Sequence, residues 1–162
     1  MVARYPLILN ASANQIQELP SGDTLIGFGA LQARTTTSAA TGAIAQAASA
    51  DITIPASGKS FALLKIAISA PAWVVLYIDS ASRTSDASRT EGTDPTPGSG
   101  VIAEVSTTTA GASTFNMTPA VYGWNNDGTP AAQIYAKVVN KQASPSGTLA
   151  ITVSLTSLPL EG

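Results

Sequence analysis

Carboxylates are the main side chains able to do acid–base chemistry in this 162-residue chain, because the sequence contains no histidine and no cysteine. A Ser-His-Asp triad, a thiol nucleophile and the commonest zinc ligands are therefore excluded. Paired acids of the kind that hydrolyse glycosides remain, but nothing in the spacing of the candidate acids selects a pair. The candidates are Asp79, Asp86, Glu91, Asp94 and Glu104. We expect a protein that is not an enzyme.

Three of these acids fall in the segment Ser80–Gly100, which is long for a loop in a compact domain. One interpretation is a contact loop that reaches a neighbouring subunit through arginine–carboxylate pairs. A second is an ordered loop whose ion pairs are internal. A calcium loop is disfavoured, because the acids do not alternate as in an EF-hand. The residues of the predicted subunit contact are Arg83, Arg89, Asp86, Glu91 and Asp94.

A second candidate site is the run Trp124-Asn-Asn-Asp-Gly128, in which a ring stands beside amide and carboxylate groups. It could stack on a sugar ring and hydrogen-bond it, or it could be a plain turn after a core tryptophan. We favour the turn and count Trp124 among the core aromatics. Trp73 lies in a strongly apolar run and is also predicted to be buried. A carbohydrate-binding module for host-surface glycans stays as an alternative function.

The elements that position these residues are short strands, because apolar residues alternate with polar ones from Asp51 onward. Leu64, Ile66 and Ile68 are predicted to share one face of a strand. The clearest strand, 148–156, alternates at Leu149, Ile151, Val153 and Leu155. Six to eight such runs without a long helix predict an all-β protein. We expect an antiparallel β-sandwich or jelly-roll-like domain over residues 51–162.

Two segments precede this domain. Residues 1–29 hold short apolar stretches interrupted by Asn, Pro and Gly, which are too short to form a core. We expect an extended docking arm whose apolar anchors are Leu7, Leu9, Ile16, Leu19 and Leu25. Residues 30–50 are rich in Ala and Thr and are predicted to be a linker. A short Ala-rich helix and a strand ordered by its neighbours remain open alternatives there.

Composition limits the partners. Charged residues make up 11% of the chain and the net charge is −2, which disfavours a nucleic-acid surface. The longest apolar run, Ala70–Ile78, is far short of the ~20 residues of a membrane helix. We expect neither nucleic acid nor membrane as a partner. A neutral surface of this kind suits packing against copies of the chain or neighbouring subunits.

Two parts of the sequence resemble a known family of proteins. The segments Leu7–Asn10 and Gln15–Leu25 together resemble a motif that recurs in virion proteins of tailed bacteriophages, often in tail fibres. The blocks Phe61–Tyr77, Ala81–Arg89 and Asp94–Val105, with the closing β run, resemble small virion structural proteins of cyanophages. The resemblance implies a non-enzymatic component located in the virion, with no cofactor.

On this resemblance we expect a structural subunit that docks through its arm as a tail, neck or fibre component. A capsid decoration (cement) protein is the alternative. In either place the arm would add strands to the edge of a partner's sheet. The expected partners are other virion proteins and copies of the chain itself, with a homotrimer favoured over a dimer.

Overall fold

The chain forms two compact units, residues 1–31 and residues 32–162. The structure is a computed structural model, and it describes residues 7–10, 15–18, 32–143 and 147–161. In the first unit, β1 (Leu7–Asn10) and β2 (Gln15–Glu18) pair antiparallel. Three predicted anchors lie on these strands, with Leu9 opposite Ile16 and Leu7 opposite Glu18. The other two, Leu19 and Leu25, lie outside the described residues.

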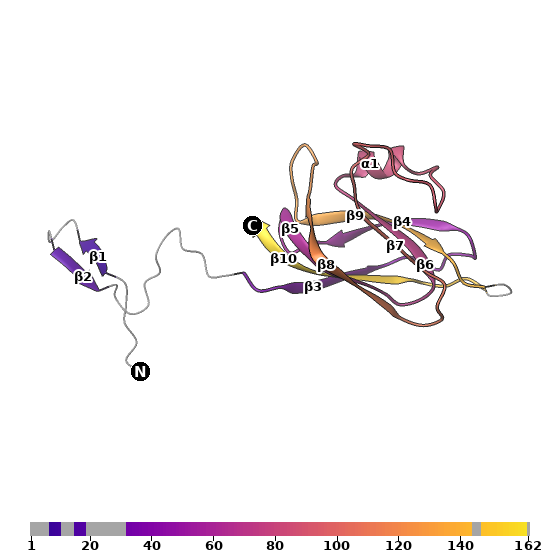
Figure 1. Ribbon diagram of the computed structural model, residues 1–162, viewed down its shortest axis with the longest axis horizontal. Coiled ribbons are helices and arrows are strands. Elements are labelled where there is room, and N and C mark those ends of the chain that lie inside the picture. Colours follow the sequence, from indigo (N-terminus) through magenta and orange to yellow (C-terminus); the bar gives the residue numbers. More distant parts are fainter. Residues whose placement is uncertain (1–6, 11–14, 19–31, 144–146, 162) are drawn as a thin grey trace. The chain divides into compact units, whose positions relative to one another are not determined.

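The second unit is a sandwich of two four-stranded antiparallel sheets, which confirms the predicted all-β class (Figure 1). The strand order is β3-β10-β5-β8 in one sheet and β4-β9-β6-β7 in the other. The strands are β3 (Thr35–Ala40), β4 (Ser49–Pro55), β5 (Ser60–Ile68), β6 (Ala72–Tyr77), β7 (Val101–Thr107), β8 (Ser113–Trp124), β9 (Gln133–Asn140) and β10 (Thr152–Glu161).

The core lies between the two sheets and is made of the inward-facing members of each alternating strand. Removing such side chains from water stabilises the fold by about 1.5–3 kcal/mol each. One sheet contributes Phe61, Leu63, Ile66, Ile68, Val153 and Leu155, and the other contributes Ile52, Ile54, Val74, Leu76, Ile134 and Val138. The period-two pattern therefore reports burial, as expected for strands that have one face in a core.

The predicted linker is the part of the domain division that needs correction. Within residues 30–50, β3 pairs along its whole length with β10, and Ile44 forms a bridge with Leu149. Thr41 is also buried, and its hydroxyl accepts a hydrogen bond from the Ile151 amide at 2.9 Å. The alternative of a strand ordered by its neighbours is therefore the one that the structure contains. The sandwich begins before Asp51.

A β-bulge in β5 corrects the predicted position of Leu64. Thr156 of β10 pairs with Lys65, but the next residue, Ser157, pairs with Leu63, so Leu64 is the extra residue. Before the bulge the odd-numbered residues Phe61 and Leu63 face the core, and after it the even-numbered residues Ile66 and Ile68 do. Leu64 is half-buried, whereas Leu63 is fully buried.

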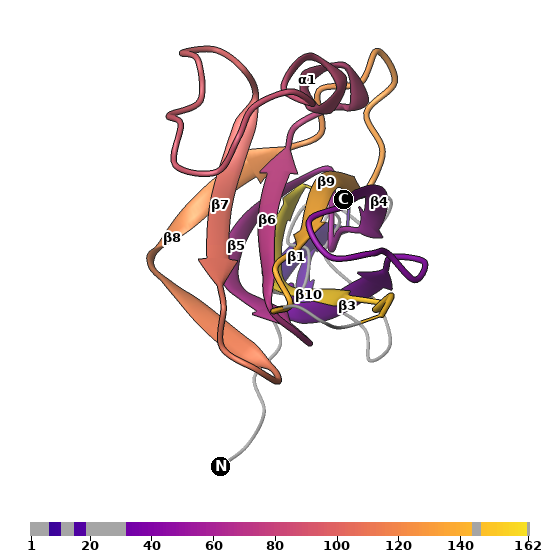
Figure 2. The same ribbon diagram turned by 90° about the vertical axis from the view of Figure 1, so that its right-hand side faces the viewer.

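The segment that follows β6 covers the outer face of the second sheet. It begins with α1 (Ser80–Ser85), whose N-cap Asp79 accepts a hydrogen bond from the Ser82 amide at 2.6 Å. Figure 2 shows α1 and the loop after it at one end of β6 and β7. A backbone hydrogen bond from Ile78 to the Gly100 carbonyl, 2.9 Å long, closes the base of this excursion.

Candidate functional site

The outer face of β6 is apolar, and the segment 80–100 keeps it from water. Trp73, Val75 and Tyr77 are almost completely buried although they point away from the main core. The burial of Trp73 confirms the prediction made for it. Charged groups contact this face directly, Arg89 and Lys137 at the Trp73 ring and Asp86 at the Tyr77 hydroxyl, so the site depends on how their charges are satisfied.

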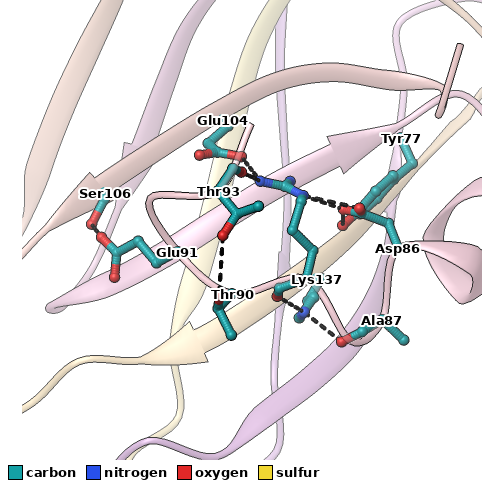
Figure 3. Close-up of polar contacts among 10 residues, drawn as sticks. Tyr77, Asp86, Ala87, Thr90, Glu91, Thr93, Glu104, Ser106 and Lys137 are labelled. Carbon is teal, nitrogen blue, oxygen red and sulfur yellow. Dashed lines mark hydrogen bonds and ion pairs between the residues drawn. The ribbon is translucent and has the colours of Figure 1, made fainter. Parts of the chain in front are cut away.

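Arg89 is the centre of this cover. Its Nε donates to both carboxylate oxygens of Asp86 at 2.9 and 2.8 Å, and its Nη1 donates to Glu104 at 2.6 Å. The Arg89 and Asp86 side chains are only 6% and 8% exposed. The Tyr77 hydroxyl donates to Asp86 at 2.7 Å. Figure 3 shows Tyr77 and Asp86 on one side of the guanidinium group and Glu104 on the other.

The environment of Tyr77 changes its acidity. Burial, reinforced by the hydrogen bond to the Asp86 carboxylate, raises the pKa of the Tyr77 phenol well above its usual value. The phenol therefore remains a hydrogen-bond donor throughout the neutral range. It donates to the Asp86 oxygen, Oδ2, that also accepts from Arg89 Nε, which ties the loop to β6.

Lys137 of β9 anchors the same loop through the loop's backbone carbonyls. Its Nζ donates to the carbonyl oxygens of Ala87 at 2.7 Å and Arg89 at 3.0 Å, and it lies 5.0 Å from the centre of the Trp73 ring. Burial lowers the pKa of this amine. Because its donors serve backbone carbonyls, Lys137 acts here as an anchor of the loop.

Two further ion pairs tie other residues of the segment 80–100 to the sandwich. Glu91 accepts a hydrogen bond from Lys141 at 2.6 Å and another from the Ser106 hydroxyl, and these two contacts lower the pKa of the Glu91 carboxyl. Arg83 lies 3.2 Å from the Asp51 carboxylate and donates to the Ile52 carbonyl at 2.9 Å.

Of the five residues predicted to contact another subunit, four are thus engaged within the chain. The fifth, Asp94, is exposed and takes no part in the ion pairs found among the described residues. The alternative of internal ion pairs describes this loop, while the subunit contact stays a prediction. In the described part of the chain, no three acidic side chains gather closely enough to hold a metal ion.

The structure overturns the prediction that Trp124 belongs to the core. Its side chain is 52% exposed, and Tyr122, two residues earlier on β8, is 68% exposed. Both rings border a shallow groove of about 250 Å³ next to Ile78, Gly98 and Gly100. Gly123 between them is buried and lies opposite Phe61 in the register. The two aromatics therefore share the outward face of β8.

The polar residues after Trp124 serve mainly to build the turn. Asn125 is buried, donates to the Gln133 carbonyl at 3.2 Å and accepts from the Ala131 amide at 3.1 Å. Asp127 accepts a hydrogen bond from the Tyr135 hydroxyl at 2.7 Å, which lowers the pKa of the Asp127 carboxyl. Only Asn126 of this trio is exposed. The residue types suit a sugar contact, but Asn125 is buried and Asp127 is only partly exposed.

Sequence reasoning did not find the roles of Lys137 and Tyr122. Lys137 occupies an outward position on a strand, where a lysine normally meets water, so no local pattern marks it. Tyr122 had a usable signal, since it lies two residues from Trp124 and so shares its face on a strand.

Comparisons with known proteins add no relative: no protein-family model matches the chain, and no curated protein matches it. The class of the protein follows from its structure, which is an all-β, two-sheet antiparallel sandwich with a separate N-terminal hairpin. Among the residues that the structure describes, no helix has the length and apolar character needed to cross a bilayer.

Proposed function

We propose that this chain is a structural subunit of a tailed-phage virion, which docks through residues 1–29 as a tail, neck or fibre component. The motifs that resemble virion proteins support this function, and a capsid decoration protein is the alternative location. The charged residues support a non-catalytic role, because Asp86, Glu91 and Glu104 are each paired with a cation.

The division into two units is the observation that carries the proposal. The sandwich core described above is supplied by strands that follow residue 32. In contrast, β1 and β2 share a ladder of only four residue pairs. A two-stranded hairpin of this size is marginally stable in water on its own. Its strands gain most when another sheet supplies further main-chain hydrogen bonds.

A deletion of residues 1–31 tests this division of roles. We expect the shortened chain to keep the circular dichroism and thermal transition of the sandwich, but to be lost from purified particles. Incorporation is measured by the amount of chain that sediments with virions. Incorporation at the level of the full chain would contradict docking through this segment, and loss of folding would contradict the division into units.

Substitutions in the hairpin give a finer test with a matched control. Leu9 and Ile16 form one register pair, and Asn10 and Gln15 form the neighbouring pair. We expect the double change Leu9→Ser with Ile16→Ser to reduce incorporation at least tenfold, which corresponds to ~1.4 kcal/mol of docking free energy. The double change Asn10→Ser with Gln15→Ser should leave it nearly unchanged. Equal loss in both variants would contradict apolar anchoring.

A further inference from the structure

The exposed face of β8 carries an aromatic pair that the core does not explain. In the described part of the chain, Tyr122, Trp124 and Leu160 are the large hydrophobic side chains that remain exposed. Tyr122 and Trp124 are two residues apart on one strand, so their Cα atoms are about 7 Å apart. Two aromatic side chains therefore lie next to each other on the exposed face of β8, and we call this pair the platform.

The strand that carries the platform packs closely against its neighbour β5. β8 pairs with β5, and Gly123 lies opposite Phe61. A Cβ atom at Gly123 would come within 2.8 Å of the Phe61 ring, so strand and ring are in close contact. Rigid aromatic side chains bind with little loss of conformational entropy, which favours them as recognition surfaces.

The groove beside the platform is neutral and partly lined by bare backbone. Its other walls are Ile78, Val101 and Ile102, and its lining contains no charged side chain. Gly98 has a φ of +81°, and nothing lies within 4 Å of the position its Cβ would take. A ligand can therefore approach the main chain closely at this point.

A polar rim borders the groove at Ile78. The backbone N–H of Asn126 donates to the Ile78 carbonyl at 2.9 Å, and the side-chain Nδ2 of Asn126 donates to the Asp79 carboxylate at 3.0 Å. Asn126 is exposed and Asp79 is half-buried, so both side chains keep capacity for further hydrogen bonds. The site thus combines an apolar platform with a few oriented polar groups, as small-molecule sites do.

We propose that this groove, which we call the aromatic groove (Ile78, Gly98, Gly100, Val101, Ile102, Tyr122 and Trp124), binds a neutral pyranose unit of a glycan. The C–H face of the sugar stacks on the Tyr122 and Trp124 rings, while its hydroxyl groups meet Asn126 and Asp79 at the rim. The ligand is neutral because the lining supplies no cation for a phosphate, sulfate or carboxylate.

Other occupants fit these observations less well. A strand of nucleic acid would stack its bases on such rings, but its backbone needs a basic groove, which this lining does not provide. A second copy of the chain needs about 800 Å² of contact on each partner. Two aromatic side chains supply at most about 150–250 Å² each.

The size of the groove sets the expected affinity. Its volume of about 250 Å³ is below the ~300–1,000 Å³ of sites for drug-sized ligands. One sugar unit should therefore bind weakly, with a Kd of about 1 mM. An assembly that presents several copies would bind a repeating glycan more tightly through multivalency.

The test uses the full chain and a panel of methyl glycosides of glucose, galactose, mannose and N-acetylglucosamine. Binding is read by saturation-transfer NMR and by protection of tryptophan fluorescence from iodide. Because Trp73 is buried and Trp124 is exposed, iodide quenching reports mainly on Trp124. We expect transfer to the C–H protons of at least one sugar, with a matching decrease in quenching.

Variants locate the binding. Trp124→Ala and Tyr122→Ala should each weaken saturation transfer at least tenfold, while Trp124→Phe should keep part of it. Leu160→Ala is the matched control, since Leu160 is similarly exposed (55%) and is not part of the groove lining. It should bind like the unchanged chain.

Three results would each overturn the proposal. The first is no transfer to any sugar of the panel at about ten times the expected Kd, and the second is equal transfer in Trp124→Ala. A third would be self-association of the full chain that Trp124→Ala abolishes, because the groove would then be an interface between copies. None of these results depends on residues 1–31, so a failure here is distinguishable from a failure of virion docking.

Discussion

Replacing Arg89 with methionine should destabilise the sandwich strongly, because it leaves a buried carboxylate without its cation. The two side chains are 6% and 8% exposed, and the contact uses both oxygens of Asp86. Removing one partner from a buried pair costs about 3–5 kcal/mol. Asp86 keeps the Tyr77 hydroxyl, and methionine keeps apolar contact near the Trp73 ring, which lies 5.3 Å from the guanidinium carbon. We therefore expect the lower end, about 3 kcal/mol.

Urea unfolding followed by circular dichroism at neutral pH measures this change. Arg34→Met is the control, since Arg34 is exposed and forms none of the ion pairs found in the described residues. It should change the free energy of unfolding by no more than about 0.5 kcal/mol. Adding Asp86→Asn completes a double-mutant cycle. The double variant should be less destabilised than the sum of the single ones by about 1–3 kcal/mol.

The reasoning would be refuted if Arg89→Met unfolded within about 0.5 kcal/mol of the unchanged chain. It would also be refuted by additive single changes, because additivity means that the two groups do not interact. Either result would show that the segment 80–100 rests on β6 without help from its central ion pair.

Two further predictions concern β8 and Tyr77. Gly123→Ala should destabilise the sandwich by about 1–3 kcal/mol, because the new methyl group meets the Phe61 ring. Gly128→Ala, where nothing lies within 4 Å of the added Cβ, is the control in thermal unfolding; equal effects would contradict the packing argument. Because the pKa of Tyr77 is raised in the fold, its contribution is complete below about pH 10 and is lost as the pH rises further. Tyr77→Phe should therefore lose less stability than the unchanged chain between about pH 9 and 11; parallel curves from pH-dependent urea unfolding would contradict this.

The sandwich could be predicted from the sequence because its strands each have one face in a core. In the predicted strand 148–156, the alternating residues Ile151, Val153 and Leu155 lie in the core and Leu149 packs against it, although β10 itself begins at Thr152. Leu64 was misplaced because a bulge changes the phase of the alternation without changing the composition of the strand. Alternation thus predicts the sheet and fails where the register slips.

β3 could not be predicted from any pattern of side chains. It is an edge strand, and its residues Thr35–Ala40 are Thr, Ser and Ala without apolar alternation. It is ordered by main-chain pairing with β10, and by contacts such as the 2.8 Å hydrogen bond between the Thr36 and Thr156 hydroxyls. These interactions come from a strand more than a hundred residues away in the sequence. The residues 30–50 by themselves therefore do not decide between a linker, a helix and a strand.

The alternation of inward and outward residues along β8 also explains why Trp124 is exposed. Phe115, Met117 and Val121 point toward the core, so every even-numbered residue near them on β8 points outward. The inward position between Tyr122 and Trp124 is a glycine, whose missing side chain hides the alternation and makes the run look uniformly apolar. A glycine is required there because Phe61 fills the space behind it. The packing that forces Gly123 into the core is therefore also what presents Tyr122 and Trp124 to solvent. The exposure of this aromatic pair thus follows from the packing of β8 on β5 and needs no rearrangement of the segment 80–100.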